Sequence, residues 1–336
     1  MSHSRKNRPA VQECVEGILK GNRILLSRAI TLIESQLPED NRLARQIIEK
    51  IMPYTGNSIR IGITGVPGVG KSTFIESFGN LAVEQGHKLS VLAIDPSSKK
   101  SGGSILGDKT RMESLSRSEN AFIRPSSART SVGGVAHKTR ETALLCEAAG
   151  YDVIIIETVG VGQSEMAVYE MVDFFLLLML AGAGDELQGI KKGIMEMADA
   201  IAITKADGEN INAAKKAKAA YQNALHLFPL PESGWSPKVV TCSAYKNEGV
   251  GDIWELVTGY AEMAKQNGYW RERRNRQNVS WMYEGIDDYL RTRFFEHPII
   301  KNELEKITKQ VENGEISALK AASYLIEAFE LKSGIV

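Results

Sequence analysis

Residues 65–72 form a glycine-rich segment whose spacing is typical of a phosphate-binding loop. The segment follows the pattern G-x-x-x-x-G-K-[ST] and reads Gly65-Val66-Pro67-Gly68-Val69-Gly70-Lys71-Ser72, with Thr73 next in the chain. Glycines let the backbone approach phosphates closely, so that successive N–H groups point at them. The lysine brings a positive charge to the β and γ phosphates, and the serine hydroxyl can bind Mg²⁺. The pattern therefore predicts a nucleotide-phosphate site.

Two short segments further along the chain indicate which base this site binds. The first resembles the guanine-binding [NT]-K-x-D element of GTPases and reads Thr204-Lys205-Ala206-Asp207. The Asp207 carboxylate can accept hydrogen bonds from N1–H and the 2-amino group of guanine, whereas adenine offers neither donor. The stem of Lys205 can pack over the base. The second segment matches the S-A element, whose backbone N–H groups contact guanine O6, and comprises Ser243 and Ala244, with Tyr245 next. Together the two segments predict GTP rather than ATP.

Acidic side chains stand at the ends of two apolar runs that are expected to lead into the site. Asp95 follows one run, and Glu157 ends another. The carboxyl ends of parallel strands face the ligand in nucleotide-binding sheets, so both carboxylates are expected to face Mg²⁺ or the attacking water. A helix N-cap is the alternative role for Asp95. Ras-like GTPases place a water-orienting glutamine directly after the switch glycine, whereas here Val161 follows Gly160. Slow intrinsic hydrolysis is therefore expected unless another loop or a partner supplies the missing group.

Apolar runs alternate with amphipathic stretches from residue 59 to about residue 264, and these elements must position the site. Continuous apolar runs are typical of parallel strands that are covered on both faces. Six such runs are expected to be strands: Ile59–Thr64, Leu89–Ile94, Val153–Glu157, Phe174–Leu180, Ala200–Thr204 and Lys238–Cys242. Because helical stretches lie between them, the pattern predicts an α/β fold with a doubly wound, mostly parallel sheet.

Helical patterns flank this region on both sides. Residues 8–52 contain three apolar stripes at helical spacing. Three more follow residue 268, the first of which contains Val279, Met282, Tyr283, Ile286 and Leu290. An amphipathic helix must bury its stripe, here either on the α/β domain or on another copy of the chain. The predicted division is an N-terminal helical cap over 1–56, a P-loop GTPase domain over 57–267 and a C-terminal helical dimerisation extension over 268–336.

The composition argues against several other classes of protein. The chain has 336 residues with 41 Lys plus Arg and 41 Asp plus Glu, and this balance disfavours nucleic acid as a partner. Cys14, Cys146 and Cys242 lie too far apart for a disulfide framework or a metal-ligand spacing. The start of the chain lacks the apolar core of a signal peptide, and the most apolar run is too short to span a bilayer. We therefore expect a cytoplasmic protein without membrane contact.

At these motifs the sequence resembles the MeaB/ArgK family of P-loop GTPases, called MMAA in animals, within the group that includes the hydrogenase nickel chaperone HypB. The resemblance covers essentially the whole chain, and ETVGVGQSE next to a GxPGxGKS loop is its most specific part. The matching segments are GVPGVGKSTF (65–74), AIDPSS (93–98), GGSILGDKTRM (102–112), GGVAHKTRE (133–141), ETVGVGQSE (157–165), AGAGDELQGIKKGIMEMAD (181–199), TKADG (204–208) and SA (243–244).

The resemblance implies a function that spacing alone does not indicate. Members of this family are G-protein chaperones of adenosylcobalamin-dependent acyl-CoA mutases, chiefly methylmalonyl-CoA mutase. They gate delivery of the cofactor and protect or reactivate the mutase, with GTP hydrolysis as the switch. The family is also dimeric through its C-terminal helices, which implies a homodimer here.

The resemblance also assigns roles to individual residues. Residues 65–73 would bind the phosphates, with Lys71 in the catalytic set. Mg²⁺ and water would be positioned by Ser72, Asp95, Asp108 and Glu157. A third switch loop, which couples the mutase to the nucleotide site, would contain Gln188 and Lys191. On its charge alone, Lys191 could replace the missing glutamine, although a solvated lysine at a helix start fits equally well.

Two other functions compete with this interpretation. One is an ArgK-type ATP-using kinase linked to transport of basic amino acids, against which the TKAD and SA segments count because they indicate guanine. The other is a nickel chaperone like HypB. That function requires clustered Cys and His ligands, whereas Cys146 and His137 stand alone in the sequence.

Overall fold

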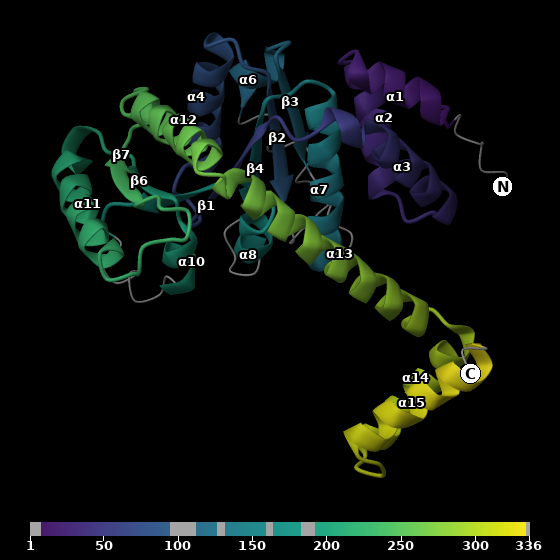
Figure 1. The fold of residues 1–336 in the computed structure, drawn as a ribbon. Coiled ribbons are helices and arrows are strands. Elements are labelled where there is room, and N and C mark those ends of the chain that lie inside the picture. The colour runs from purple at the N-terminus through teal and green to yellow at the C-terminus, as the bar shows by residue number, and fades with distance from the viewer. Residues whose placement is uncertain (1–7, 95–111, 126–131, 159–163, 183–191, 334–336) are drawn as a thin grey trace. The chain divides into compact units, whose positions relative to one another are not determined.

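The computed structural model describes residues 8–94, 112–125, 132–158, 164–182 and 192–333 (Figure 1). The chain divides into two compact units, Met1–Asn275 and Arg276–Val336. The first unit contains the sheet and the N-terminal helices, and the second contains the C-terminal helices. The three-part division at residues 56 and 267 stays a prediction.

A parallel sheet of seven strands lies at the centre of the first unit, in the order β3-β2-β4-β1-β5-β6-β7. Its strands are β1 (Ile59–Gly65), β2 (Leu89–Ile94), β3 (Ala121–Pro125), β4 (Val153–Thr158), β5 (Phe174–Leu180), β6 (Ala200–Thr204) and β7 (Lys238–Thr241). The first strand lies in the middle, where Ile61 is in register with Ile155 of β4 and Phe174 of β5. The predicted α/β class and the six predicted strands are confirmed. The apolar runs do not predict β3, one of the two edge strands.

Helices cover both faces of this sheet. On one face, α4 (Lys71–Glu84) and α12 (Val250–Gln266) pack on a core that includes Ile61 and Ile63. Phe78 of α4 contacts Trp254 of α12 edge-on, with 5.4 Å between ring centroids. On the opposite face, a Cβ at Gly62 would lie only 2.9 Å from Val168, so this glycine lets α8 (Ser164–Tyr169) approach β1 closely. The remaining helices of this region are α6 (Glu113–Arg117), α7 (Val132–Ala148), α10 (Lys192–Met197) and α11 (Ile211–Leu225).

The N-terminal helices form a small cap that packs beside the sheet. They are α1 (Val11–Leu19), α2 (Arg23–Glu34) and α3 (Pro38–Ile51), and α2 and α3 pack on α7 (Figure 1). The turn before α2 is fixed locally, because the Asn22 side chain accepts hydrogen bonds from the N–H groups of Ile24 and Leu25 at 3.0 and 3.1 Å. Most side chains of the predicted stripes in this cap are buried, but Leu37 is 55% exposed.

A largely buried arginine, Arg274, connects the start of α13 (Tyr269–Phe295) to the amino ends of the strands. Arg274 donates to both carboxylate oxygens of Asp173 at 2.8 and 2.7 Å, and to the carbonyls of Gly56 and Ser58 at 2.7 and 2.6 Å. Asp173 also accepts a hydrogen bond from the backbone N–H of Arg60 at 2.8 Å. These contacts join the segment before β1, the segment before β5 and α13 in one network.

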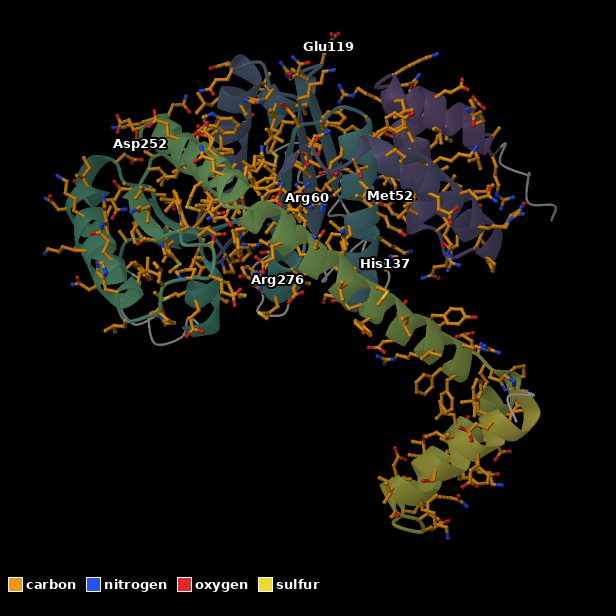
Figure 2. All side chains as sticks on the ribbon, viewed as in Figure 1. Met52, Arg60, Glu119, His137, Asp252 and Arg276 are labelled. Carbon is orange, nitrogen blue, oxygen red and sulfur yellow. The ribbon has the colours of Figure 1, made fainter. Side chains whose placement is uncertain are left out.

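A second ion pair lies next to this network inside the unit. Arg60 contacts Glu147 at 3.1 Å, and both side chains are almost fully buried. Burial alone would raise the pKa of Glu147, but the Arg60 and Arg274 guanidiniums hold it below its usual value. In Figure 2, Arg60 lies within the unit, whereas Glu119 and Asp252 lie at its surface.

The second unit contains the rest of α13 together with α14 (Pro298–Glu312) and α15 (Ala318–Ser333). A small core of Ile300, Ile307, Ala321 and Leu325 joins α14 to α15. The predicted stripe of α13 from Val279 to Leu290 is helical, but its side chains are 45–61% exposed. The other helices of the second unit therefore do not bury that stripe.

Candidate nucleotide site

The phosphate-binding loop connects β1 to α4, as the strand–loop–helix pattern predicts. Gly68 and Gly70 have left-handed backbone torsions, with φ of 79° and 93°, and Gly70 directly precedes the first residue of α4. A side chain is strained at such positions. A Cβ at Gly65 would lie 2.5 Å from the carbonyl oxygen of Leu178. The glycines of the motif thus meet local requirements of this loop and of its packing on β5.

Lys71 is the first residue of α4, and its side chain reaches back to the phosphate-binding loop. Its Nζ donates to the carbonyl of Gly65 at 2.8 Å and contacts that of Val66 at 3.5 Å. Burial lowers the pKa of Lys71, and the nearby carboxylates of Glu157 and Glu165 oppose this shift. The ammonium group is therefore held beside the loop backbone in the position where a bound phosphate would replace the carbonyls as its partner. Ser72 is half-buried in the same helical turn, and Thr73 is exposed.

The end of β6 contacts the phosphate-binding loop directly. The Thr204 hydroxyl donates to the carbonyl of Val69 at 2.8 Å and contacts that of Met179 at 3.2 Å. Lys205 Nζ donates to the carbonyl of Gly68 at 2.8 Å, and the backbone of Lys205 is left-handed with φ of 55°. The predicted base element and the predicted phosphate element are thus hydrogen-bonded to each other.

The second predicted base element lies beside the first because β6 and β7 are neighbours. The Ser243 hydroxyl donates to the carboxylate of Asp207. The N–H of Ala206 donates to the carbonyl of Cys242 at 3.0 Å. Ser243 is buried, whereas Tyr245 is 87% exposed. Two segments far apart in sequence therefore meet at one end of the sheet, where they can bind one planar base.

Among the predicted carboxylates, Glu157 lies near Lys71. It is 9% exposed at the end of β4, in register with Ile63 of β1. The adjacent Thr158 donates through its hydroxyl to Thr64 at 2.7 Å. Glu165 on α8, to which no role was assigned from the sequence, is also buried and near Lys71. Its presence in the segment ETVGVGQSE is the one signal that could have pointed to it. The predicted residues outside the described part of the chain are Asp95, Asp108, Gln188 and Lys191.

The described residues give no support to a metal-cargo site. Among them, no group of three or more His, Cys, Asp or Glu side chains is placed to hold a metal ion. The three cysteines are unpaired and buried. Burial raises the pKa of Cys146 and Cys242 to about 12, so both thiols are protonated near neutral pH. Nor is any described helix long and apolar enough to cross a membrane.

The parallel sheet, the strand–loop–helix phosphate site and the paired base segments define a P-loop protein of the GTPase class. Residues 26–298 match the family model described as "Methylmalonyl Co-A mutase-associated GTPase MeaB". The chain belongs to this MeaB family of GTPases.

Relatives align over most of their length. The Escherichia coli "GTPase ArgK" is 46% identical over 86% of this chain and 87% of its own. The mouse "Methylmalonic aciduria type A homolog, mitochondrial" is 43% identical over 97% of this chain and 81% of its own. The crystal structure of a protein named "LAO/AO transport system kinase" is 38% identical, with a TM-score of 0.76 over 96% of this chain and 99% of that chain.

Proposed function

We propose that this protein is a GTP-hydrolysing G-protein chaperone that binds an adenosylcobalamin-dependent acyl-CoA mutase, with methylmalonyl-CoA mutase as the first client to test. In this role it gates loading of the cofactor and protects or reactivates the mutase. The family description supports the client, and the names of the curated relatives support the GTPase chemistry. The choice of GTP is supported by one observation. The two guanine-binding segments are joined by the Asp207–Ser243 hydrogen bond, and Lys205 of the first segment contacts the phosphate-binding loop.

Hydrolysis on this site is a matter of positioning and charge. Water attacks the γ-phosphate in line with the leaving group, while residues 65–73 hold the phosphates and Lys71 neutralises charge that develops on them. The hydroxyl of Ser72 and the carboxylate of Glu157 are oxygen ligands of the kind that Mg²⁺ prefers, and Asp95 and Asp108 are proposed to complete this set. Bound Mg²⁺ supplies charge stabilisation to the β and γ phosphates.

Because no glutamine follows Gly160, another residue has to orient the attacking water. Gln188 or Lys191, or a residue of the mutase, would do so when client and GTP are both bound. Loss of the γ-phosphate would then release the switch loops and change the face that the mutase contacts.

The C-terminal helices are proposed to join two copies of the chain into a homodimer. The exposed stripe Val279–Leu290 of α13 supports this, because a row of large apolar side chains at helical spacing is typical of a partner surface. Deletion of residues 279–336 should leave a monomer in light scattering. A truncated protein that remains dimeric would place the dimer interface elsewhere.

The alternative is an ATP-using kinase linked to transport of basic amino acids. One observation favours it, because the similar crystal structure is that of a protein named as a transport system kinase. The Asp207 carboxylate counts against it, because adenine lacks the N1–H and 2-amino donors that guanine offers to that group.

Turnover of GTP and ATP by the purified protein, alone and with methylmalonyl-CoA mutase, tests the proposal. We expect slow turnover of GTP only, which rises when mutase is added. Lys71→Ala should abolish tight nucleotide binding, while exposed Lys215→Ala serves as its control. Asp207→Asn should weaken the preference for GTP over ATP. GTP turnover that no mutase alters would refute the client, and preferential ATP turnover would refute the base assignment.

A further inference from the structure

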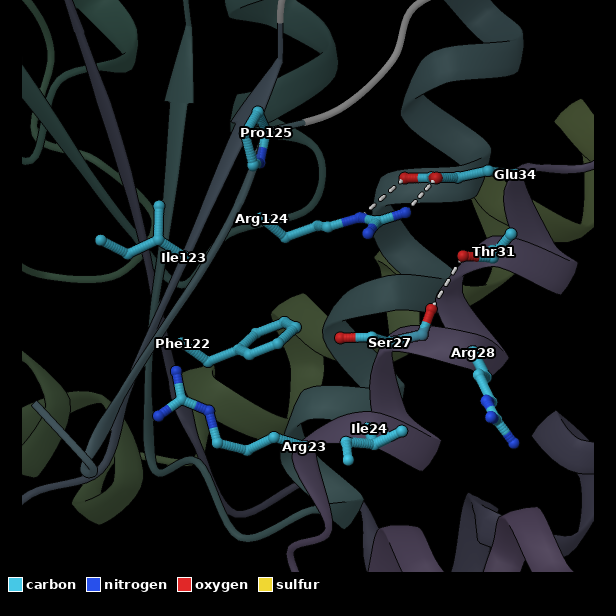
Figure 3. Close-up of a pocket in the computed structure, with 10 residues that line it drawn as sticks. All are labelled: Arg23, Ile24, Ser27, Arg28, Thr31, Glu34, Phe122, Ile123, Arg124 and Pro125. Carbon is cyan, nitrogen blue, oxygen red and sulfur yellow. Dashed lines mark hydrogen bonds and ion pairs between the residues drawn. The ribbon is translucent and has the colours of Figure 1, made fainter. Parts of the chain in front are cut away.

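A pocket outside the nucleotide site lies between α2 of the helical cap and the edge strand β3 (Figure 3). Its volume of about 570 Å³ is in the range of ligand-binding pockets. Phe122 and Arg124 extend from β3 towards α2, and Ser27 faces them from the helix (Figure 3). Ile123 points to the opposite side, where it belongs to the core of the sheet. The floor of the pocket is therefore the outer edge of β3.

The register of β3 shows which backbone groups face this pocket. Leu89 of β2 donates to the carbonyl of Asn120 at 2.8 Å, so in a parallel ladder the even-numbered residues of β3 bond to β2. The odd-numbered residues face outward. The carbonyl of Ala121 is already occupied by Arg23 at 2.8 Å, and Pro125 has no N–H. Among the described residues, the N–H and C=O of Ile123 have no partner on this open edge.

The helical wall of the pocket is positively charged. Arg124 is neutralised by Glu34 of α2, with contacts of 3.4 and 2.5 Å. Arg23 bonds only to backbone carbonyls, and neither it nor Arg28 has a carboxylate partner within the described part of the chain. Two cationic residues of α2, Arg23 at its start and Arg28 further along, thus line the pocket that contains the open N–H and C=O of Ile123. A backbone N–H and C=O without partners, next to guanidiniums that have no carboxylate partner in the described residues, matches the chemistry of an acidic residue within an extended peptide.

We propose that this pocket binds an extended acidic peptide segment of a partner protein, which adds to the edge of β3. The segment runs antiparallel to β3, and one of its residues exchanges both backbone hydrogen bonds with Ile123. Its two neighbours direct their side chains to the same face as Phe122 and Arg124, towards α2, because side chains alternate along a strand. Acidic residues at those neighbouring positions reach Arg23 and Arg28. The proposal is independent of the nucleotide chemistry and of the mutase client.

The test uses the full-length protein saturated with GDP, so that an acidic probe does not occupy the phosphate site. The probe is a fluorescein-labelled peptide of alternating Val and Glu, Val-Glu-Val-Glu-Val, and binding is followed by fluorescence anisotropy. We expect saturable binding and no binding of the matching Val-Lys peptide. Arg28→Glu should weaken binding about fivefold or more. Arg42→Glu, at an exposed arginine of α3 outside the pocket, should leave it unchanged.

Methylated peptides test the backbone pairing without altering the protein. In the proposed register the valines pair with Ile123 and the glutamates do not. N-methylation of the valines should therefore weaken binding about fivefold, whereas N-methylation of the glutamates should not. Amide hydrogen exchange of residues 121–124 should slow when the peptide binds.

Four results would overturn the proposal. The first is equal binding of the Lys peptide, and the second is equal loss with both methylated peptides. The third is displacement of the probe by free N-acetylglutamate at the peptide's own concentration, which would make the pocket a site for small carboxylates instead. A lack of any binding to the Val-Glu peptide would refute it as well.

Discussion

Arg274 is predicted to be one of the main stabilising residues of the unit Met1–Asn275. It makes two hydrogen bonds to Asp173 and two to backbone carbonyls, and the two side chains are only 12% and 2% exposed. In Arg274→Ala the buried carboxylate loses its counter-charge and keeps the N–H of Arg60. Breaking a buried ion pair from one side costs about 3–5 kcal/mol. We expect Arg274→Ala to lower the free energy of unfolding by this amount.

Urea unfolding followed by circular dichroism measures this change, and Arg271→Ala is the matched control. Arg271 lies on the same helix with an exposed side chain, so its replacement should change stability by no more than about 0.5 kcal/mol. Because Arg274 contacts the amino ends of the strands, GDP affinity of the folded variant should not change. The reasoning is refuted if Arg274→Ala costs less than about 1 kcal/mol, or if Arg271→Ala costs as much.

A double variant separates two costs of Arg274→Ala: the loss of its hydrogen bonds and the unpaired charge left on Asp173. Asp173→Asn keeps an oxygen that can accept from Arg60 but removes the negative charge. Adding Arg274→Ala to Asp173→Asn should therefore cost less than adding it to the natural protein. Equal costs in both backgrounds would show that the carboxylate is not the group that needs Arg274.

Three further predictions each concern the replacement of one residue. Burial raises the pKa of Asp199 to about 6, so stability should fall by up to about 3 kcal/mol as the pH rises from about 4 to 6, because the folded state binds more protons there. In Asp199→Asn, the free energy of unfolding measured in urea should not show this fall between the two pH values. If the variant shows the same fall, other groups cause it. Gly70→Ala should strain the left-handed turn by about 1–2 kcal/mol and weaken GDP binding in a fluorescence titration, with Gly193→Ala on α10 as a control with open space. Thr204→Val should leave the carbonyl of Val69 unbonded and lower stability by about 1–3 kcal/mol, and an unchanged thermal midpoint would contradict this.

Local patterns are sufficient to predict the centre of the fold and its phosphate loop. Central parallel strands are buried on both faces, so a run such as Phe174–Leu180 must be apolar throughout. The edge strand β3 escapes this rule, because it is five residues long and contains Arg124 and Pro125. An edge needs less burial and tolerates a proline.

Contacts between distant segments could not be predicted in the same way. The Glu165 carboxylate acts to raise the pKa of Lys71 only because α8 packs beside β1 and β4. No spacing in the sequence encodes this approach. Arg274 and Asp173 stand 101 residues apart, and each is an ordinary charged residue in its own segment. The stripe from Val279 to Leu290 does predict a helix, but amphipathicity alone does not say which molecule covers it.

The central position of β1 has a consequence for how the protein is made. Both partners of Ile61, Ile155 and Phe174, lie far downstream of it, so a growing chain exposes β1 and the attached phosphate loop long before either edge can be paired. Such long-range parallel pairing folds slowly. The loop can gain its shape only after β5 has been synthesised, and GTP can first be held when the sheet is largely complete. Nucleotide binding would then mark the end of folding on the ribosome, and chains stalled before β5 would depend on chaperones to protect an exposed apolar strand.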